Sequence, residues 1–532
     1  MPESAAFDAL AREFFSVWLR YHPGAALAAG LGDYGRLPAP QSDDDHAALG
    51  SWLETLVVAL QELDHAALDP ARRLDAELMF ALAVVEHREL LERDWRRRDP
   101  LRYVPLTEIH RLTLLRPATL RDDLLALLEA IPAHLRLAMT QLTPMAELIP
   151  PPLVTAAIRT ADAGPGYLRA LAGSRWLRAH CHGSSEIEAA AERAAAALRQ
   201  YATGLRSSIA PRAAAPCGCG AEHLSFLLHR RHRLEIAPAD CAPMLDALLQ
   251  APGVGAGEAA ADTTPGAWDK IGAECAHQET LLRELGLFRL PAASLRATGG
   301  PVCPRLDAAR LGIDYVPDLV RGQGTLYLAD RSTAQDAHSL AALRLRCLEL
   351  GWGGLHTLTF AGGMAARSLP RLLAGGSSLT RGWPLALLGH LVAAQNQVTA
   401  PSNPSLLAHL VQDVRRAAIA HARLDLDLHL GRIDLAQAHA RATALGDADQ
   451  VLAELIQRPG DALAAVLGWQ LIEAARGQLR AAGDEPATLR GFHDSLLRQG
   501  PVPASMALAT VVGEATAGTL MARLTTPAGI PA

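Results

Sequence analysis

One carboxylate and one histidine in the run LELGWGGLH, residues 348–356, have the types and the spacing of an acid–base pair. Glu349 and His356 are seven residues apart, two turns of a helix, so a continuous helix would place both on one face. The leucines and tryptophan around Glu349 would exclude water from it, the environment in which a carboxyl group serves as a general acid or base. The same carboxylate can instead be a structural partner of Arg344 or Arg346.

Three glycines interrupt the helix that we predict around this pair, from Ser332 to Gly363. Ser332 and Gln335 form a capping box at its start, and apolar residues follow at helical spacing. Each glycine inside a helix costs roughly 1 kcal/mol relative to alanine. We therefore expect close packing or a backbone break at these glycines, which are Gly351, Gly353 and Gly354.

A second carboxylate–imidazole pair lies further along the chain. Asp425 and His429 are at positions i and i+4 of a predicted helix, where the carboxylate can orient the imidazole and raise its basicity. The pair is also common on ordinary helix surfaces. His493, in the run Phe492-His493-Asp494, is most simply a partly buried, hydrogen-bonded histidine.

The densest group of potential zinc ligands does not have the spacing of a known zinc module. Arginines at positions 230, 231 and 233 would also oppose a bound cation, so we expect a loop followed by a basic, solvated helix end. The group consists of Cys217, Cys219, His223, His229 and His232.

The sequence contains no dinucleotide-binding, P-loop, nucleophile-elbow or HExxH motif, and we predict no cofactor and no metal.

The composition is that of a folded globular protein. Of the 532 residues, 50% are hydrophobic and 20% charged, and the net charge of −6 gives no reason to expect nucleic acid or an anionic membrane as a partner. An odd number of cysteines, seven, indicates reduced thiols. The N-terminal residues lack the pattern of a signal peptide, and no apolar run is long enough to span a membrane, so we expect a cytoplasmic protein. Lys270 is the only lysine, so Schiff-base chemistry would have to use it.

The elements that must position these residues are mostly helices, with one clear strand at residues 322–330. We interpret the cluster Arg96–Arg98 as a solvated helix end. The proline-, alanine-, glycine- and cysteine-rich segment 209–220 is predicted to connect two helical lobes, about 1–210 and 211–532, of one domain. Helices are predicted over residues 4–21, 70 to about 96, 119–142 with a break at Pro132, 185–204, 222–233, 238–250, 404–431, 434–446, 462–482 and 488–499.

Several segments together are similar to one family of proteins. They are the N-terminal helix with Pro23, WRRRDPLRY from Trp95, GTLYLAD from Gly324, LDLDLHLGRIDLAQA from Leu424, PGDALAAVLG from Pro459 and FHDSLLRQGPVP from Phe492. The chain resembles the bacterial family described as domain of unknown function 885, whose members look like helical zinc metallopeptidases of the HExxH-plus-glutamate kind. The resemblance covers the whole chain. It implies a mainly α, large multi-helix, gluzincin-like fold with at most a small β-sheet.

The residues that would bind zinc in this family are replaced here. The family motif H-E-x-x-P-G-H-H-L falls on residues 348–356, where Glu349 and Gly353 match but the three histidine positions are Leu348, Gly354 and Leu355. The motif S-x-F-x-E-G-W-A falls on residues 377–384 and places Arg381 at the third ligand, where a guanidinium group cannot coordinate zinc. The family's tyrosine and lysine are also replaced, by Ala465 and Val466, whereas Asp425 and His429 match.

The sequence therefore predicts a catalytically degenerate, metallopeptidase-like protein that binds a small-molecule or peptide ligand in an internal cavity. Arg381, Trp352 and Trp383 are the expected ligand-binding residues, and Glu349, Arg381 and His429 are expected to converge on one cavity. One alternative is a repurposed enzyme that uses Glu349, His356, Asp425 and His429 as acid–base groups on a small metabolite. Another is an active hydrolase with an unconventional metal site, built on His356 or on the group from Cys217 to His232.

Overall fold

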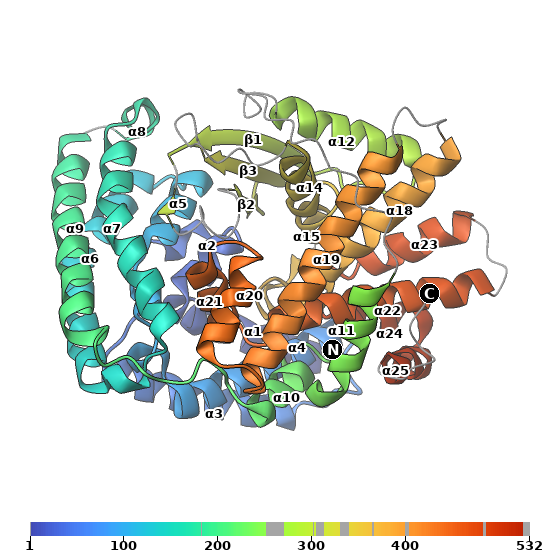
Figure 1. The fold of residues 1–532 in the computed structure, drawn as a ribbon, viewed down its shortest axis with the longest axis horizontal. Helices are drawn as coiled ribbons and strands as arrows, with labels where there is room; N and C mark the ends of the chain where they lie inside the picture. The colour runs from blue at the N-terminus through green and yellow to red at the C-terminus, as the bar shows by residue number, and fades with distance from the viewer. Residues whose placement is uncertain are drawn as a thin grey trace. The chain divides into compact units, whose positions relative to one another are not determined.

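The computed structural model describes residues 2–181, 184–251, 271–301, 303–304, 313–329, 340–363, 367–398, 404–481 and 486–524. These residues form many helices and one three-stranded sheet, so the predicted mainly α fold is confirmed (Figure 1). The chain divides into two units. Unit 1 comprises Met1–Cys217, Thr298–Arg331 and Gly446–Ile456, and unit 2 comprises Gly218–Ala297, Ser332–Leu445 and Gln457–Ala532.

Unit 1 is built mainly from the first half of the chain. As predicted, Asp69 caps the helix that begins at Pro70, and its carboxylate accepts hydrogen bonds from the amides of Ala71 and Arg72. Its helices are α1 Pro2–Tyr21, α2 Pro23–Ala28, α3 Asp43–Glu62, α4 Pro70–Arg93, α5 Leu106–Leu115, α6 Leu120–Leu142, α7 Pro151–Ala172, α8 Arg175–His180, α9 Ser184–Gly204 and α21 Ala448–Gln457, with short 3-10 helices between several of them.

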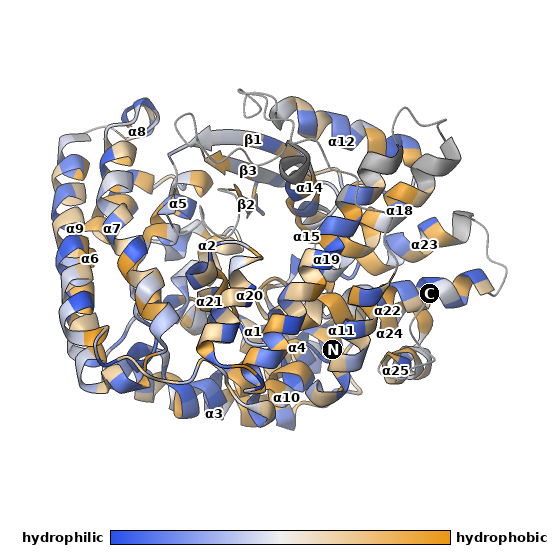
Figure 2. Ribbon diagram, viewed as in Figure 1, coloured by the Kyte–Doolittle hydropathy of each residue, from blue (hydrophilic) through white to orange (hydrophobic). Residues whose placement is uncertain are grey.

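The long helices α6, α7 and α9 pack together in unit 1. α9 carries hydrophilic and hydrophobic residues along its whole length (Figure 2), and its small buried alanines allow close approach to its neighbours. At Gly164 of α7, an added Cβ atom would lie 2.7 Å from a methyl carbon of Leu198, so glycine permits this contact. α6 continues through Pro132, contrary to the predicted break, because the buried residues Ile131 and Leu135 on either side hold both halves in the core.

The sheet has the strand order β1-β3-β2. Its strands are β1 Ser294–Gly300, β2 Ile313–Asp318 and β3 Gln323–Ala329, and β3 matches the strand predicted from the sequence. β2 and β3 form an antiparallel hairpin in which Ile313 pairs with Leu328 and Asp318 with Gln323. Gly322, with φ +62°, completes the turn between them.

Unit 2 contains the remaining helices. The helix α22 is its core, because α17, α18 and α19 all pack against it. Gly468 in α22 allows the backbone of α17 to pass so closely that any side chain would overlap the carbonyl oxygen of Ser378. The helices are α10 Ala221–Arg230, α11 Cys241–Gln250, α12 Ile271–Leu285, α14 Leu340–Leu350, α15 Leu355–Phe360, α16 Leu369–Ala374, α17 Ser377–Thr380, α18 Gly382–Val398, α19 Pro404–His429, α20 Leu435–Thr443, α22 Asp461–Ala481, α23 Pro486–Leu497, α24 Ala504–Val512 and α25 Glu514–Arg523.

The sequence predicted a solvated helix end at the arginine cluster after α4, and this prediction is wrong. Arg96 is only 3% exposed and donates hydrogen bonds to the carbonyl oxygens of Gln41 and Ser42 and to Asp94. A buried guanidinium group needs such a complete set of acceptors. The cluster is therefore part of the fold of unit 1.

Some predictions fall outside the part of the chain that the structure describes. These are the capping box at Ser332 and Gln335, Lys270, and the side chain of Arg344 as a partner of Glu349.

Candidate functional site

The long helix predicted around Glu349 is two helices separated by a tight turn. α14 ends at Leu350, residues 351–354 form the turn, and α15 begins at Leu355. Gly354 has φ −143° and ψ −111°, and a Cβ atom there would overlap the carbonyl oxygen of Glu349. A Cβ atom at Gly351 or Gly353 would also lie within 2.6 Å of the preceding helix. The glycines thus mark a backbone break, one of the two outcomes expected from the sequence.

The break separates Glu349 from His356, so the prediction that they share one helical face is wrong. Glu349 is half-buried and forms an ion pair with Arg346 at 2.6 Å. His356 is fully buried, and its Nε2 lies 3.2 Å from the carbonyl oxygen of Ala293. Burial lowers the pKa of His356 to about 4, so its ring is neutral near pH 7.

The second predicted pair, Asp425 and His429, is fully buried and links three segments of unit 2. The carboxylate of Asp425 accepts hydrogen bonds from the amides of Gly460 and Leu463, both 3.1 Å, at the start of α22. It therefore acts as an N-cap supplied by a different helix. These hydrogen bonds explain why a buried carboxylate lies near the end of α19. The role that they give Asp425 is structural.

His429 completes this junction. Its Nε2 lies 3.3 Å from Asp425, and its Nδ1 accepts a hydrogen bond from the amide of Cys219 at 3.1 Å. Burial lowers the pKa of His429, but the contact with Asp425 outweighs this and raises the pKa to about 10. The hydrogen bond from the Cys219 amide opposes protonation of Nδ1, because the amide N–H is donated to the lone pair that the proton would occupy.

The residues expected to converge on one cavity have different neighbours in unit 2. Arg381 is exposed at the end of α17, Glu349 contacts Arg346, and His429 contacts Asp425. Trp352 is 4% exposed and Trp383 is fully buried, so both indole rings belong to the core. The shared cavity stays a prediction.

The group of cysteines and histidines does not form a metal centre in the part of the chain that the structure describes, where no three candidate ligands have suitable geometry. Burial raises the pKa of the Cys217 thiol to about 11, which disfavours the thiolate that binds metals. His232 is fully buried, with Nε2 3.4 Å from Asp461, so the expected solvated helix end is also wrong here.

A buried polar cluster in unit 2 brings together residues that the sequence analysis mostly missed. Glu473 of α22 lies 3.5 Å from Nε2 of His390, 3.4 Å from Arg415 and 3.2 Å from Arg476. Burial opposes ionisation of Glu473, but His390 and the two arginines lower its pKa to about 2. The carboxylate is therefore ionised and held by two cations.

Two imidazole rings stack beside this carboxylate. His390 and His493 have ring centroids 4.9 Å apart and planes 14° apart, and Trp383 packs edge-on against His493. Nδ1 of His493 contacts the carbonyl oxygen of Leu287 at 3.0 Å, so His493 is hydrogen-bonded as predicted, although more deeply buried. Burial and the nearby His390 lower the pKa of His493 to about 3.

Four ring nitrogens of this cluster have no hydrogen-bond partner within the described residues. They are Nδ1 and Nε2 of His390, Nε2 of His493 and Nε1 of Trp383, although Nε2 of His390 lies 3.5 Å from Glu473. An unpaired buried polar atom costs about 1–3 kcal/mol. The available sequence signal was a lone polar residue within an apolar run, as with His390 in LALLGHLVAA and Glu473 in GWQLIEAA.

The fold is shared with solved structures. No protein-family model and no curated protein matches it. A putative lipoprotein of unknown function from Shewanella oneidensis has a TM-score of 0.64 at 14% identity, covering 94% of this chain and 98% of that one. A putative lipoprotein from Colwellia psychrerythraea has a TM-score of 0.73 at 14% identity, covering 96% and 99%. At this identity the likeness establishes the fold alone.

These names correct one prediction. Both neighbours are named putative lipoproteins, and lipoproteins are exported and membrane-anchored, which contradicts the expected cytoplasmic location. Among the helices of the described residues, none combines the length and the apolar character needed to cross a membrane.

Proposed function

We propose that the protein is a metallopeptidase-like binding protein, a degenerate relative of the family described as domain of unknown function 885, that holds a peptide without hydrolysing it. The observation that carries this proposal is the replacement of the ligand positions at and beside the turn of residues 351–354. The family motif H-E-x-x-P-G-H-H-L falls on residues 348–356, and its three histidine positions carry Leu348, Gly354 and Leu355, none of which can bind zinc. At Gly354 the turn also passes so close to the backbone of Glu349 that no side chain fits.

The local geometry also supports the loss of individual ligands. The position of one family histidine is Gly354, where the backbone of Glu349 leaves no room for a side chain. Glu349, the residue that would activate a zinc-bound water, is instead paired with Arg346. A zinc hydrolase needs three protein ligands and one open position. The described residues of this region do not offer that set.

We propose a peptide as the ligand because a metallopeptidase binds peptides, and this chain is proposed to keep that fold while lacking the residues that bind zinc. Binding without cleavage requires recognition groups but no activated water. We do not propose the alternative enzyme, because the carboxylate of Asp425 caps α22 and His429 is held between Asp425 and the amide of Cys219.

The test combines metal content with peptide binding. Purified full-length protein is saturated with zinc, desalted and analysed by elemental mass spectrometry, and we expect far less than one zinc per chain. The same protein is dialysed to equilibrium against a tryptic digest of serum albumin. We expect some peptides to be enriched severalfold on the protein side and to be recovered uncut.

The matched control is Glu349→Gln, which should change neither result. One tightly bound zinc per chain, together with new peptide fragments that disappear in Glu349→Gln, would overturn the proposal. Equal peptide concentrations on both sides of the membrane would refute binding.

A further inference from the structure

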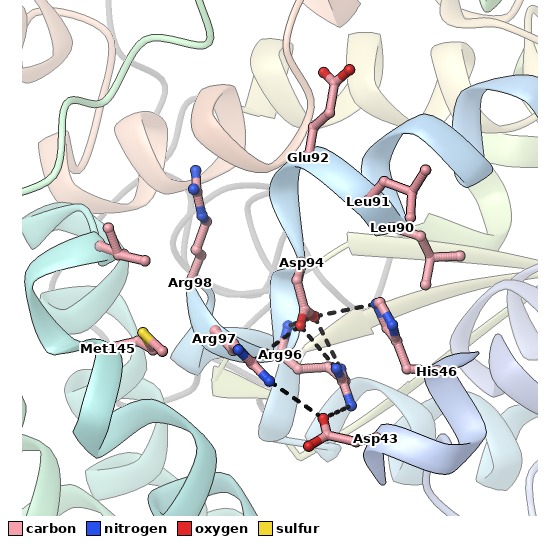
Figure 3. Close-up of a pocket in the computed structure, with 11 residues that line it drawn as sticks. Asp43, His46, Leu90, Leu91, Glu92, Asp94, Arg96, Arg97, Arg98 and Met145 are labelled. Atoms are coloured by element: carbon pink, nitrogen blue, oxygen red, sulfur yellow. Dashed lines mark hydrogen bonds and ion pairs between the residues drawn. The ribbon is translucent and has the colours of Figure 1, made fainter. Parts of the chain in front are cut away.

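A pocket of about 470 Å³ lies entirely within unit 1 (Figure 3). Its walls come from the first turn of α3, the end of α4 with the residues that follow it, and the 3-10 segment Thr143–Leu148. This volume is in the range of small-molecule sites. Nothing in the function proposed above depends on it.

One side of the pocket is a network of charges that compensate one another. Arg96 contacts Asp94 at 2.9 Å and Asp43 at 3.0 Å, and Arg97 contacts the same two carboxylates. His46 lies with Nε2 3.6 Å from Asp94. Burial, followed by the charge of Arg96, lowers the pKa of His46, so this side carries no free positive charge from its histidine.

Arg98 stands apart from this network. Figure 3 shows its side chain turned away from the ion pairs, and its guanidinium group makes no hydrogen bond or ion pair with any residue that the structure describes. Glu92, the other lining carboxylate, is paired with Arg88 at 2.9 Å. Burial and the charge of nearby Arg93 lower the pKa of Arg98 by more than the charge of Asp94 raises it, so this guanidinium group is only partly compensated.

Apolar side chains also line the pocket, with Met145 on the side of Arg98 and Leu90 and Leu91 on the side of His46 (Figure 3). Leu91 is 69% exposed and Leu148 is 41% exposed, two of the larger exposed hydrophobic residues in the described part of the chain. Met145 and Leu90 add to the same lining. Met145 is unbranched and adaptable, which suits it to contact with a flexible apolar ligand.

We propose that this pocket binds an amphipathic monocarboxylate, with its carboxylate on Arg98 and its apolar body against Leu91, Met145 and Leu148. A guanidinium group presents two parallel donors that match a carboxylate. A ligand with two negative charges fits less well, because Asp43, Glu92 and Asp94 also line the pocket and would repel it. A cation placed against the same apolar residues would be repelled by Arg98.

The experiment measures binding of octanoate to the full-length protein by isothermal titration calorimetry. Each part of the ligand should be needed, so acetate and 1-octanol should each bind at least tenfold more weakly than octanoate. Octyl phosphate, at a pH where it is doubly charged, should also bind more weakly. Arg98→Gln should weaken octanoate at least tenfold, because a charge-assisted hydrogen bond is lost.

Two further variants separate the site from general effects. Arg199→Gln removes one exposed arginine of unit 1 outside the pocket and should leave octanoate binding unchanged. Leu148→Ser should weaken octanoate but not acetate, and Arg98→Lys should bind octanoate more tightly than Arg98→Gln. The proposal fails if the unaltered protein does not bind octanoate, if Arg98→Gln binds it equally well, or if 1-octanol or octyl phosphate binds as tightly. None of these results bears on zinc content or peptide cleavage.

Discussion

Glu473 shows how one side chain can organise the interior of unit 2. It is the only carboxylate in contact with His390, Arg415 and Arg476 among the described residues, and it balances two guanidinium groups that are largely buried. The guanidinium of Arg415 also lies over the ring of Trp469 at 4.5 Å. Charges of this kind are tolerated in a core only while their partners remain.

Replacing Glu473 should therefore cost much more than its size suggests. We expect Glu473→Gln to lower the free energy of unfolding by about 3–5 kcal/mol, because it leaves Arg415 and Arg476 without their carboxylate. Urea denaturation followed by circular dichroism measures this. Glu514→Gln, at an exposed carboxylate in the first turn of α25, should stay within about 0.5 kcal/mol of the unaltered protein. Equal effects of the two substitutions would show that the buried network contributes nothing.

At the scale of the element, the turn between α14 and α15 is the feature that decides the proposed function. A methyl group at Gly354 collides with a backbone atom, the carbonyl oxygen of Glu349, which cannot rotate away as a side chain can. We expect Gly354→Ala to lower the free energy of unfolding by about 2 kcal/mol or more. Thermal and urea denaturation check this.

Gly477 provides the opposite case. It is an exposed glycine inside α22, and no atom lies within 4 Å of the place that a methyl group would take there. Gly477→Ala should therefore raise stability by about 0.5–1 kcal/mol. If Gly354→Ala were as harmless as Gly477→Ala, a side chain would fit at residue 354, and the steric argument against a histidine ligand there would fail.

The sequence predicted the helices better than their interruptions. Local signals such as Asp69 before Pro70, and Asp434 at the start of the next predicted helix, act within one turn, and both residues cap the helices that they precede. Pro132 was misjudged, and the outcome at Gly351, Gly353 and Gly354 was left open, because both depend on what packs beside these residues. The sequence offered a break as one possibility at the glycines, but only the approach of Glu349 decides it.

The same limit applies to the candidate site. The sequence singled out Asp425 and His429 from their spacing, but it could not show that the amides of Gly460 and Leu463 occupy the carboxylate. It held no sign that His390 and Glu473 would meet, because 83 residues separate helices that only tertiary packing brings together. Long-range partners of this kind leave no local pattern.

At the scale of the whole molecule, both units bury histidines that must stay neutral. His110 lies in unit 1, and His232, His356 and His493 lie in unit 2; all four are at most 2% exposed. Burial lowers the pKa of each to about 3–4. In the unfolded chain the same groups titrate near pH 6.5.

The sign of the resulting pH dependence follows from proton linkage. Below pH 6.5 the unfolded chain binds protons that these folded-state histidines do not, so stability is complete above pH 6.5 and is lost as the pH falls toward 4. Each histidine contributes up to about 1.4 kcal/mol per pH unit in this window. His429, whose pKa is raised to about 10, acts in the opposite sense and adds stability as the pH falls toward 6.5, with no further gain below it. Urea denaturation at pH 7.5, 6.5, 5.5 and 4.5 should therefore show little net change over the first step and a steep loss over the next two. His493→Asn should reduce the loss between pH 6.5 and 4.5, even though it lowers stability at pH 7.5. A free energy of unfolding that stays constant down to pH 4.5 would mean that the histidines are not buried as neutral rings.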